Sequence, residues 1–90
     1  MSHSRFSARE VKRRGEEIYA RSLRQRLETD ENIGKVLVID IETGDYEMDT
    51  DEIAATHRAL DKHPGATLWG LRIGYDATHA LGGALRRTHQ

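Results

Sequence analysis

Residues 36–49 read VLVIDIETGDYEMD, and the fold depends on whether this stretch forms one strand or two. Its first half is apolar and β-branched, and its second half alternates polar and apolar residues, so both halves are typical of strands. Thr43-Gly44 between them has the composition of a two-residue turn. The sequence therefore predicts a β-hairpin over residues 35–49 that reverses at Thr43-Gly44.

A two-residue turn determines which residues face one another across this hairpin. Glu42 would face Asp45, and Asp40 would face Glu47. The acidic side chains would then share one face of the hairpin, where like charges directly opposite each other are destabilising. The apolar side chains would share the other face, which must be the core face: Leu37, Ile39, Ile41, Tyr46 and Met48.

Something must compensate for these facing carboxylates, and three explanations remain open. Arg72, in the outward phase of a third strand, could neutralise Asp40 while Lys35 and solvent screen the rest. The acidic face could instead receive a basic partner surface, whose charges it would attract and orient. Metal binding is the least favoured, because a flat strand face rarely surrounds an ion with six or more oxygens, and we predict no metal site. The residues assigned to partner binding are Asp40, Glu42, Asp45, Glu47 and Arg72.

A capping box predicts where the N-terminal helix begins. The Ser7 hydroxyl would accept a hydrogen bond from the Glu10 backbone N–H, while the Glu10 carboxylate reaches back to the cap. Apolar and small residues then recur at helical spacing, so we expect a helix over residues 7–28. Gly15 costs about 1 kcal/mol relative to Ala inside a helix, and it therefore predicts a close approach to a neighbouring element.

A second helix and a third strand follow the hairpin. Asp49 and Asp51 are candidate N-caps for a helix over residues 50–62. Residues 66–75 alternate in the manner of a strand. The side chains that should line one side of the helix are Ile53, Ala54, His57 and Leu60, and those on the inward face of the strand are Trp69, Leu71, Ile73 and Tyr75.

These elements predict a single α+β domain over residues 1–76, in the order α-β-β-α-β. A right-handed crossover places the third strand beside the first and antiparallel to it, which gives a three-stranded mixed sheet of order 2-1-3. Both helices are expected to cover the apolar face, so that the other face is wet or reserved for a partner. Residues 77–90 contain a glycine pair and a basic end, and we expect a short turn or a frayed tail there.

Composition narrows the class of protein further. Ninety residues form only one domain. A chain this short buries only about 60–65% of its unfolded surface, which leaves nothing for a second core. There is no cysteine for disulfides, and no apolar run approaches the ~18–20 residues that span a bilayer, so we expect a cytoplasmic protein with no membrane partner. Residues 31–52 carry one Lys against eight Asp and Glu, and both flanking segments are basic. Such segregation of charge bears on partners rather than on fold.

A catalytic role is hard to build from this chain. The apolar strand ending in Asp-x-Glu-Thr resembles the first motif of the DEDD 3′–5′ exonucleases, whose carboxylates hold catalytic metal ions. Such a site needs at least two further carboxylates and a general base on other elements. Downstream of the acidic block, Asp61 and Asp76 are the only carboxylates. There is also no glycine-rich phosphate loop, no Gly-x-Ser-x-Gly motif and no cysteine. We therefore expect no enzyme activity and no cofactor, with a metal-dependent nuclease-like protein as the least favoured function.

The basic ends of the chain support an alternative function, nucleic-acid binding through the N-terminal helix and the C-terminal tail. Arginine and lysine side chains neutralise phosphates. Glutamates are interleaved with the first of these basic clusters, which weakens the case. The candidate nucleic-acid-binding residues are Arg9, Lys12, Arg13, Arg14, Arg86 and Arg87.

Three stretches carry a resemblance to a family. Residues 38–49 (VIDIETGDYEMD), 71–75 (LRIGY) and 15–19 (GEEIY) resemble a group of small bacterial and cyanobacterial proteins that have no established activity. Such short proteins are similar to the antitoxin-like halves of small gene pairs. The resemblance implies a non-enzymatic, protein-binding regulatory module of antitoxin type, whose partner is the product of a neighbouring gene. Homodimerisation is a further expectation, because a three-stranded sheet leaves two edges and one face open.

Overall fold

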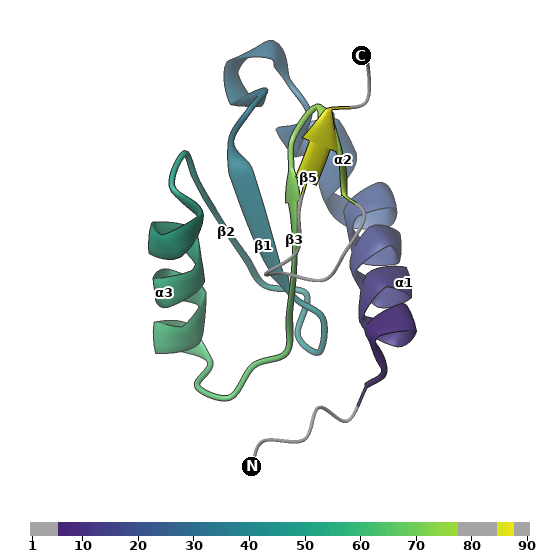
Figure 1. The fold of residues 1–90 in the computed structure, drawn as a ribbon, viewed down its shortest axis with the longest axis vertical. Coiled ribbons are helices and arrows are strands. Elements are labelled where there is room, and N and C mark those ends of the chain that lie inside the picture. Colours follow the sequence, from purple (N-terminus) through teal and green to yellow (C-terminus); the bar gives the residue numbers. More distant parts are fainter. Residues whose placement is uncertain (1–5, 78–84, 88–90) are drawn as a thin grey trace.

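The computed structural model describes residues 6–77 and 85–87. A three-stranded sheet lies between two helical layers, with α1 and α2 on one side and α3 on the other (Figure 1). Within the described ranges, no helix is long and apolar enough to cross a membrane. The elements in chain order are α1 (Ala8–Ile18), the π-helical segment η1 (Tyr19–Leu23), α2 (Arg24–Leu27), the 3-10 turn η2 (Asp30–Asn32), β1 (Val36–Asp40), β2 (Tyr46–Asp49), α3 (Glu52–Lys62), β3 (Leu68–Arg72), β4 (Tyr75–Ala77) and β5 (Leu85–Arg87).

The N-terminal helical run begins at the predicted cap. Ser7 Oγ accepts a hydrogen bond from the Glu10 N–H at 3.1 Å. α1, η1 and α2 then follow one another without a break as far as Leu27. A Cβ atom on Gly15 would overlap the indole ring of Trp69 on β3. The close approach predicted from Gly15 is therefore confirmed, and it brings the helix directly onto the sheet.

The chain reverses between β1 and β2, but the predicted two-residue turn and its register are wrong. Val38 lies opposite Glu47 and Ile39 lies opposite Tyr46, so the pairing is shifted by two residues and residues 41–45 form the connecting loop. A shift of two residues preserves the alternation of side chains. The predicted core face of the hairpin is therefore unchanged.

Asp40 explains this longer loop. Its Oδ1 accepts hydrogen bonds from the N–H groups of Glu42 (2.9 Å) and Thr43 (3.4 Å). Its carbonyl oxygen accepts a third from the N–H of Gly44, whose φ of 82° suits glycine. An aspartate that bonds to the backbone two residues ahead starts a turn at its own position. The reversal therefore begins at the end of β1 rather than at Thr43-Gly44.

Both neighbours of β1 run antiparallel to it, in the order β2-β1-β3. The predicted order 2-1-3 is confirmed, but the sheet is antiparallel throughout rather than mixed, because its two parallel strands are not neighbours. The strand predicted over residues 66–75 is divided at Gly74, whose φ is 87°, and the chain continues as β4, which pairs with β5. Of the tail predicted over residues 77–90, Ala77 and Leu85–Arg87 belong to this ribbon and the remainder lies outside the described residues.

Each face of the sheet is covered by its own helical layer, so the prediction that both helices cover one face is wrong. β1 is buried along its whole length, as expected of a strand with helices on both sides. The cluster against α1 and α2 consists of Val11, Tyr19, Leu23, Leu27, Leu37, Ile39, Ile41, Trp69, Leu71 and Ile73. The cluster against α3 consists of Val36, Val38, Ala55 and Ala59, with Leu68 packed beside them.

The inward side of α3 also differs from the prediction. Ala55 and Ala59 contact the sheet, whereas Ile53 is 66% exposed and Leu60 is 37% exposed. Asp51 is the N-cap, with its carboxylate accepting from the Ile53 N–H at 3.0 Å. Small side chains at a contact allow close approach, so the helix lies near β1 and β2 and its larger apolar residues are turned outward.

Candidate functional site

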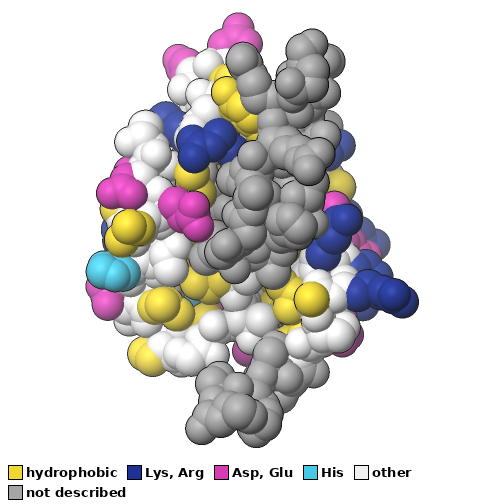
Figure 2. Space-filling view, in the orientation of Figure 1, with side chains coloured by type: hydrophobic (Ala, Val, Ile, Leu, Met, Phe, Trp, Pro, Cys, Tyr) yellow, Lys and Arg dark blue, Asp and Glu magenta, His cyan; other side chains and the backbone are white. Residues whose placement is uncertain are grey.

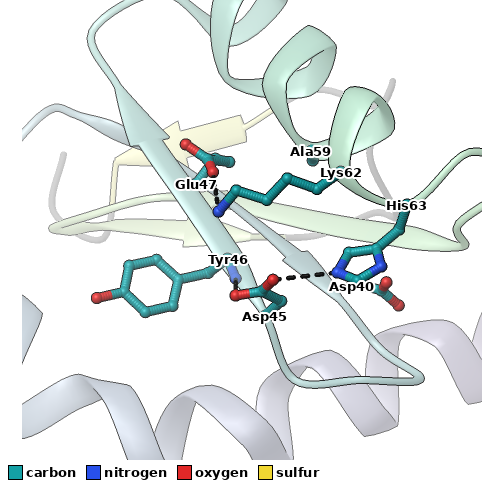
Figure 3. A pocket seen from close by; sticks show the side chains of 7 residues that line it. All are labelled: Asp40, Asp45, Tyr46, Glu47, Ala59, Lys62 and His63. Carbon is teal, nitrogen blue, oxygen red and sulfur yellow. Dashed lines mark hydrogen bonds and ion pairs between the residues drawn. The ribbon is translucent and has the colours of Figure 1, made fainter.

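Charged side chains from β2 and α3 meet along one edge of the sheet (Figure 3). Glu47 Oε1 accepts from Arg58 Nε at 3.0 Å, and the other carboxylate oxygen of Glu47 pairs with Lys62 Nζ. Arg58 Nη2 also lies 3.1 Å from Asp49 Oδ2. We call this group, together with the 3.1 Å contact between Asp45 Oδ2 and His63 Nε2, the ion-pair cluster: Asp45, Glu47, Asp49, Arg58, Lys62 and His63.

The cluster shifts the titration of its members in the direction expected for paired charges. Hydrogen bonds from Lys62 and Arg58 lower the pKa of Glu47. The hydrogen bond with His63, followed by the charge of Lys62, lowers the pKa of Asp45. In return, the hydrogen bond to Glu47 raises the pKa of both Arg58 and Lys62. The carboxylates and the two cations therefore keep their charges at neutral pH and satisfy one another.

The surface among these side chains is only a shallow depression, with no enclosed space for a ligand. Figure 3 shows its charged groups directed at one another rather than into free space. In residues 6–77 and 85–87, no group of three or more His, Asp or Glu side chains could hold a metal ion. The arrangement fastens α3 to β2, and it compensates for the acidic residues of the hairpin. That compensation comes from α3, which the sequence did not indicate.

The predicted compensation by Arg72 is wrong. Arg72 lies opposite Val36, at the other end of β1 from Asp40, and its Nη1 donates to the Gly34 carbonyl oxygen at 2.6 Å. The predicted like-charge pairs are also absent, because in the observed register Glu47 faces Val38. Arg72 on β3 is therefore not required to neutralise the carboxylates of the hairpin.

The structure separates the five residues predicted to bind a partner. Asp45 and Glu47 lie together in the ion-pair cluster, whereas Asp40 is 3% exposed and accepts hydrogen bonds from the loop. Glu42 is exposed in that loop, and Arg72 lies at the far end of the sheet. The predicted wet acidic face is covered by α3. A partner-binding role for these residues stays a prediction.

The outward side of α3 carries the most exposed apolar side chains that the sequence assigned to the core. Ile53 and Leu60 are two of the three large apolar residues classed as exposed in the described chain, and the third is Ile33. Figure 2 shows apolar side chains reaching the surface over α3. We call this surface the α3 outer stripe, defined as Ile53 and Leu60 with Thr56 and His57 between them.

A different polar feature lies inside the larger core. Tyr19 Oη and Trp69 Nε1 are buried, and neither has a hydrogen-bond partner within the described part of the chain. Burial, followed by the nearby charge of Glu28, raises the pKa of Tyr19, and the Arg24 side chain beside it opposes this shift. Tyr19 also opens the π-helical segment η1. A buried polar atom without a partner costs about 1–3 kcal/mol, so both atoms weaken an otherwise apolar core.

The basic residues of α1 are only partly available to a nucleic acid. Arg13 pairs with Glu10 and Glu17, and Arg14 pairs with Glu10 while lying over the Phe6 ring. The other candidates are placed as follows: Arg9 and Lys12 are exposed on α1, and Arg86 and Arg87 belong to β5.

The chain matches no protein-family model, no curated protein and no solved structure. The resemblance of residues 38–49 to small bacterial and cyanobacterial proteins stays a prediction.

Proposed function

We propose that the protein is a non-enzymatic, protein-binding module whose contact surface is the α3 outer stripe. The observation that carries this proposal is the inverted packing of α3. Its inward residues are the small Ala55 and Ala59, whereas Ile53 and Leu60 point to solvent. A surface helix ordinarily directs its larger apolar residues toward the core.

The exposure of these two apolar residues has a cost in free energy. Fully burying one Leu or Ile side chain is worth about 1.5–3 kcal/mol. α3 leaves part of this free energy unused, because Ile53 is 66% exposed and Leu60 is 37% exposed. Exposed apolar residues grouped on one element are typical of contact surfaces. The acidic sheet face is a weaker candidate, because α3 covers it and the cations of α3 neutralise Glu47 and Asp49.

A regulatory role of antitoxin type, with the product of a neighbouring gene as partner, is the form of this proposal that the family resemblance supports. The short, charged chain and the absence of a metal-holding group among the described residues are compatible with it. In this role the protein acts by occupying a surface of its partner, and its own residues perform no chemistry.

Capture experiments with matched variants test this function. The immobilised full chain is exposed to extract of the source organism, in parallel with Leu60→Asp and with Ile33→Asp as the control. Ile33 is also exposed, at 51%, but lies outside α3. We expect a partner protein that the unchanged chain and Ile33→Asp retain and that Leu60→Asp binds at least about tenfold more weakly. Equal retention by all three chains would rule out the outer stripe as the contact surface.

Nucleic-acid binding remains the alternative, supported by the exposed, cationic Arg9 and Lys12 on α1. Replacing both by Ala should then weaken binding to duplex DNA or RNA and reduce the dependence of affinity on salt concentration. Binding that is undetectable at 50 mM salt, or unaffected by the double substitution, would remove this alternative.

A further inference from the structure

We propose that α3 is a cover held on the sheet by charge, which opens as one unit when the ion pairs of Arg58 and Lys62 with Glu47 break. The α1–α2 side stays folded during this opening, and residues 50–66 leave the sheet and uncover Val38 on β1. We call this state the α3-open form. No partner protein takes part in the opening, so it is separate from the proposed function.

The polar links between α3 and the sheet all come from side chains in the part of the chain that the structure describes. Two of them meet at Glu47, where Arg58 Nε lies 3.0 Å from Oε1 and Lys62 Nζ pairs with the other carboxylate oxygen. No backbone hydrogen bond joins residues 52–63 to a strand among those same residues. The remaining links are those of Arg58 with the Met48 carbonyl oxygen and the Asp49 carboxylate, and that of His63 with the Asp45 carboxylate.

The apolar contact beneath α3 is small. Ala55 and Ala59 lie one helical turn apart and pack on Val36 and Val38, with Leu68 beside them. Each alanine contributes a single methyl group. Because the free energy of apolar burial grows with the area buried, this contact holds α3 less firmly than a contact of large side chains would. The ion pairs therefore supply a large share of what keeps α3 on the sheet.

The ends of α3 are capped by residues that leave with it. The Asp51 carboxylate accepts from the Ile53 N–H at 3.0 Å, and the His63 N–H donates to the Ala59 carbonyl oxygen at 3.0 Å. Neither bond involves a strand. Gly65 follows the helix with a φ of 81°, in the region that glycine adopts more readily than other residues. Opening therefore breaks no cap, and the chain after α3 has a position at which its direction can change.

The α3-open form has two measurable properties. α3 has 11 residues, and isolated helices shorter than about 12–15 residues are only marginally stable in water. Its amides should therefore exchange with solvent once the helix leaves the sheet. Val38, which is 0% exposed beneath α3, should become accessible to reagents at the same time.

Hydrogen exchange of the full chain carrying Glu47→Gln tests the ion pairs. We expect the opening constant of the α3 amides to rise at least about threefold, because both pairs exist in the closed form and are broken in the α3-open form. The Ala55 and His63 amides, at the two ends of the helix, should change together. Glu17→Gln, the same substitution in an α1 ion pair, should leave the α3 amides unchanged. If Glu47→Gln leaves them unchanged as well, the ion pairs do not hold the cover and the proposal is wrong.

A substitution on the other side of the sheet tests whether α3 opens alone. Val11 lies in the cluster against α1 and α2 and is 5% exposed. Val11→Ala should raise the opening constant of the β1 amides at least about threefold, since they open only when that side unfolds. It should leave the α3 amides unchanged, because the contacts of Val11 persist in the α3-open form. An equal rise in both sets of amides would show that α3 opens only when the whole chain unfolds, which overturns the proposal.

Thiol labelling of single cysteines supplies a second readout, because the chain has no cysteine of its own. Val38→Cys lies beneath α3, and Val11→Cys makes the same change on the other side of the sheet. We expect a small thiol reagent to label Val38→Cys at least about fivefold faster than Val11→Cys, and Glu47→Gln to accelerate the labelling of Val38→Cys. Equal labelling rates at the two positions would mean that α3 does not uncover the sheet, and they would contradict the proposal.

Discussion

The α1–α2 side of the sheet buries Trp69, Leu37 and Ile39, whereas the α3 side buries Val36 and Val38 beneath two alanines. The first contact is broad and apolar. The second contact involves few and small apolar side chains, and it is bordered by the ion-pair cluster that joins α3 to β2. Because apolar burial is the main source of folding free energy, the first side should carry most of the stability. The second leaves its larger apolar residues available for contact with another molecule.

The largest expected effect lies on the α1–α2 side. Trp69→Ala should lower the free energy of unfolding by about 3–5 kcal/mol, because Trp69 is 1% exposed and its removal leaves a cavity between α1 and β3. Urea denaturation monitored by circular dichroism measures the change. A loss below about 1 kcal/mol would mean that this side does not dominate stability.

A substitution at Gly15 also tests the contact between α1 and the sheet, with a smaller expected change in stability. Gly15→Ala should lower the free energy of unfolding by about 1–3 kcal/mol, because the added methyl group overlaps the Trp69 ring. Helix propensity alone would favour Ala by about 1 kcal/mol. In a Trp69→Leu background the overlap is relieved, so there the same substitution should stabilise. A stabilising Gly15→Ala in the unchanged chain would show that α1 does not press on the sheet.

At Tyr19 we expect a substitution that increases stability rather than lowering it. Tyr19→Phe removes a buried hydroxyl that has no hydrogen-bond partner in the described chain, so it should raise the free energy of unfolding by about 1 kcal/mol. The same denaturation experiment measures the change. A loss of stability would mean that the hydroxyl has a partner in solution.

Several features of the first side could be read from the sequence. The Ser7 cap, the close approach at Gly15, the inward face of the hairpin and the order 2-1-3 all follow from local chemistry or from periodicity. These rules act within an element or between sequence neighbours. They succeed because each residue concerned has one strongly preferred environment.

The second side could not be read in the same way. A search for the apolar side of α3 selects Ile53 and Leu60 over Ala55 and Ala59, since hydrophobicity ranks them higher. The placement of the helix instead follows from a close fit of alanines on Val36 and Val38 and from ion pairs with β2. Both depend on distances between elements. The one local signal was the apolar character of Val36 and Val38 on a face that was predicted to be wet.

The hairpin register was missed for a related reason. The alternation of the strand predicts that the Asp40 side chain lies on the strand face, but its carboxylate accepts hydrogen bonds from the backbone of the loop. A side chain that competes for backbone groups overrides the turn propensity of Thr43-Gly44. The same bonds withdraw Asp40 from the candidate site.

The smallest expected effect is a loss of stability at low pH, and it comes from the ion-pair cluster on the α3 side of the sheet. The pKa values of Asp45, Glu47 and Asp49 are lowered from their ordinary 3.8, 4.5 and 3.8, so the unfolded chain binds protons first as the pH falls. Their contribution to stability is therefore complete above about pH 5 and is lost as the pH drops below about 4.5 through the lowered values.

Denaturation at a series of pH values from neutral down to about pH 3 measures this loss. Glu47→Gln should flatten the dependence, whereas Glu17→Gln, in an exposed α1 ion pair, should not. A profile that Glu47→Gln leaves unchanged would place the acid-sensitive groups elsewhere.

Native-state hydrogen exchange tests the division between the two sides most directly, because it measures the opening free energy of each amide separately. The amides of α3, such as the His63 N–H that donates to Ala59, should open about 1–2 kcal/mol more easily than those of β1 in dilute protein. If α3 and β1 amides share one opening free energy, the two sides form a single cooperative unit and the account is wrong.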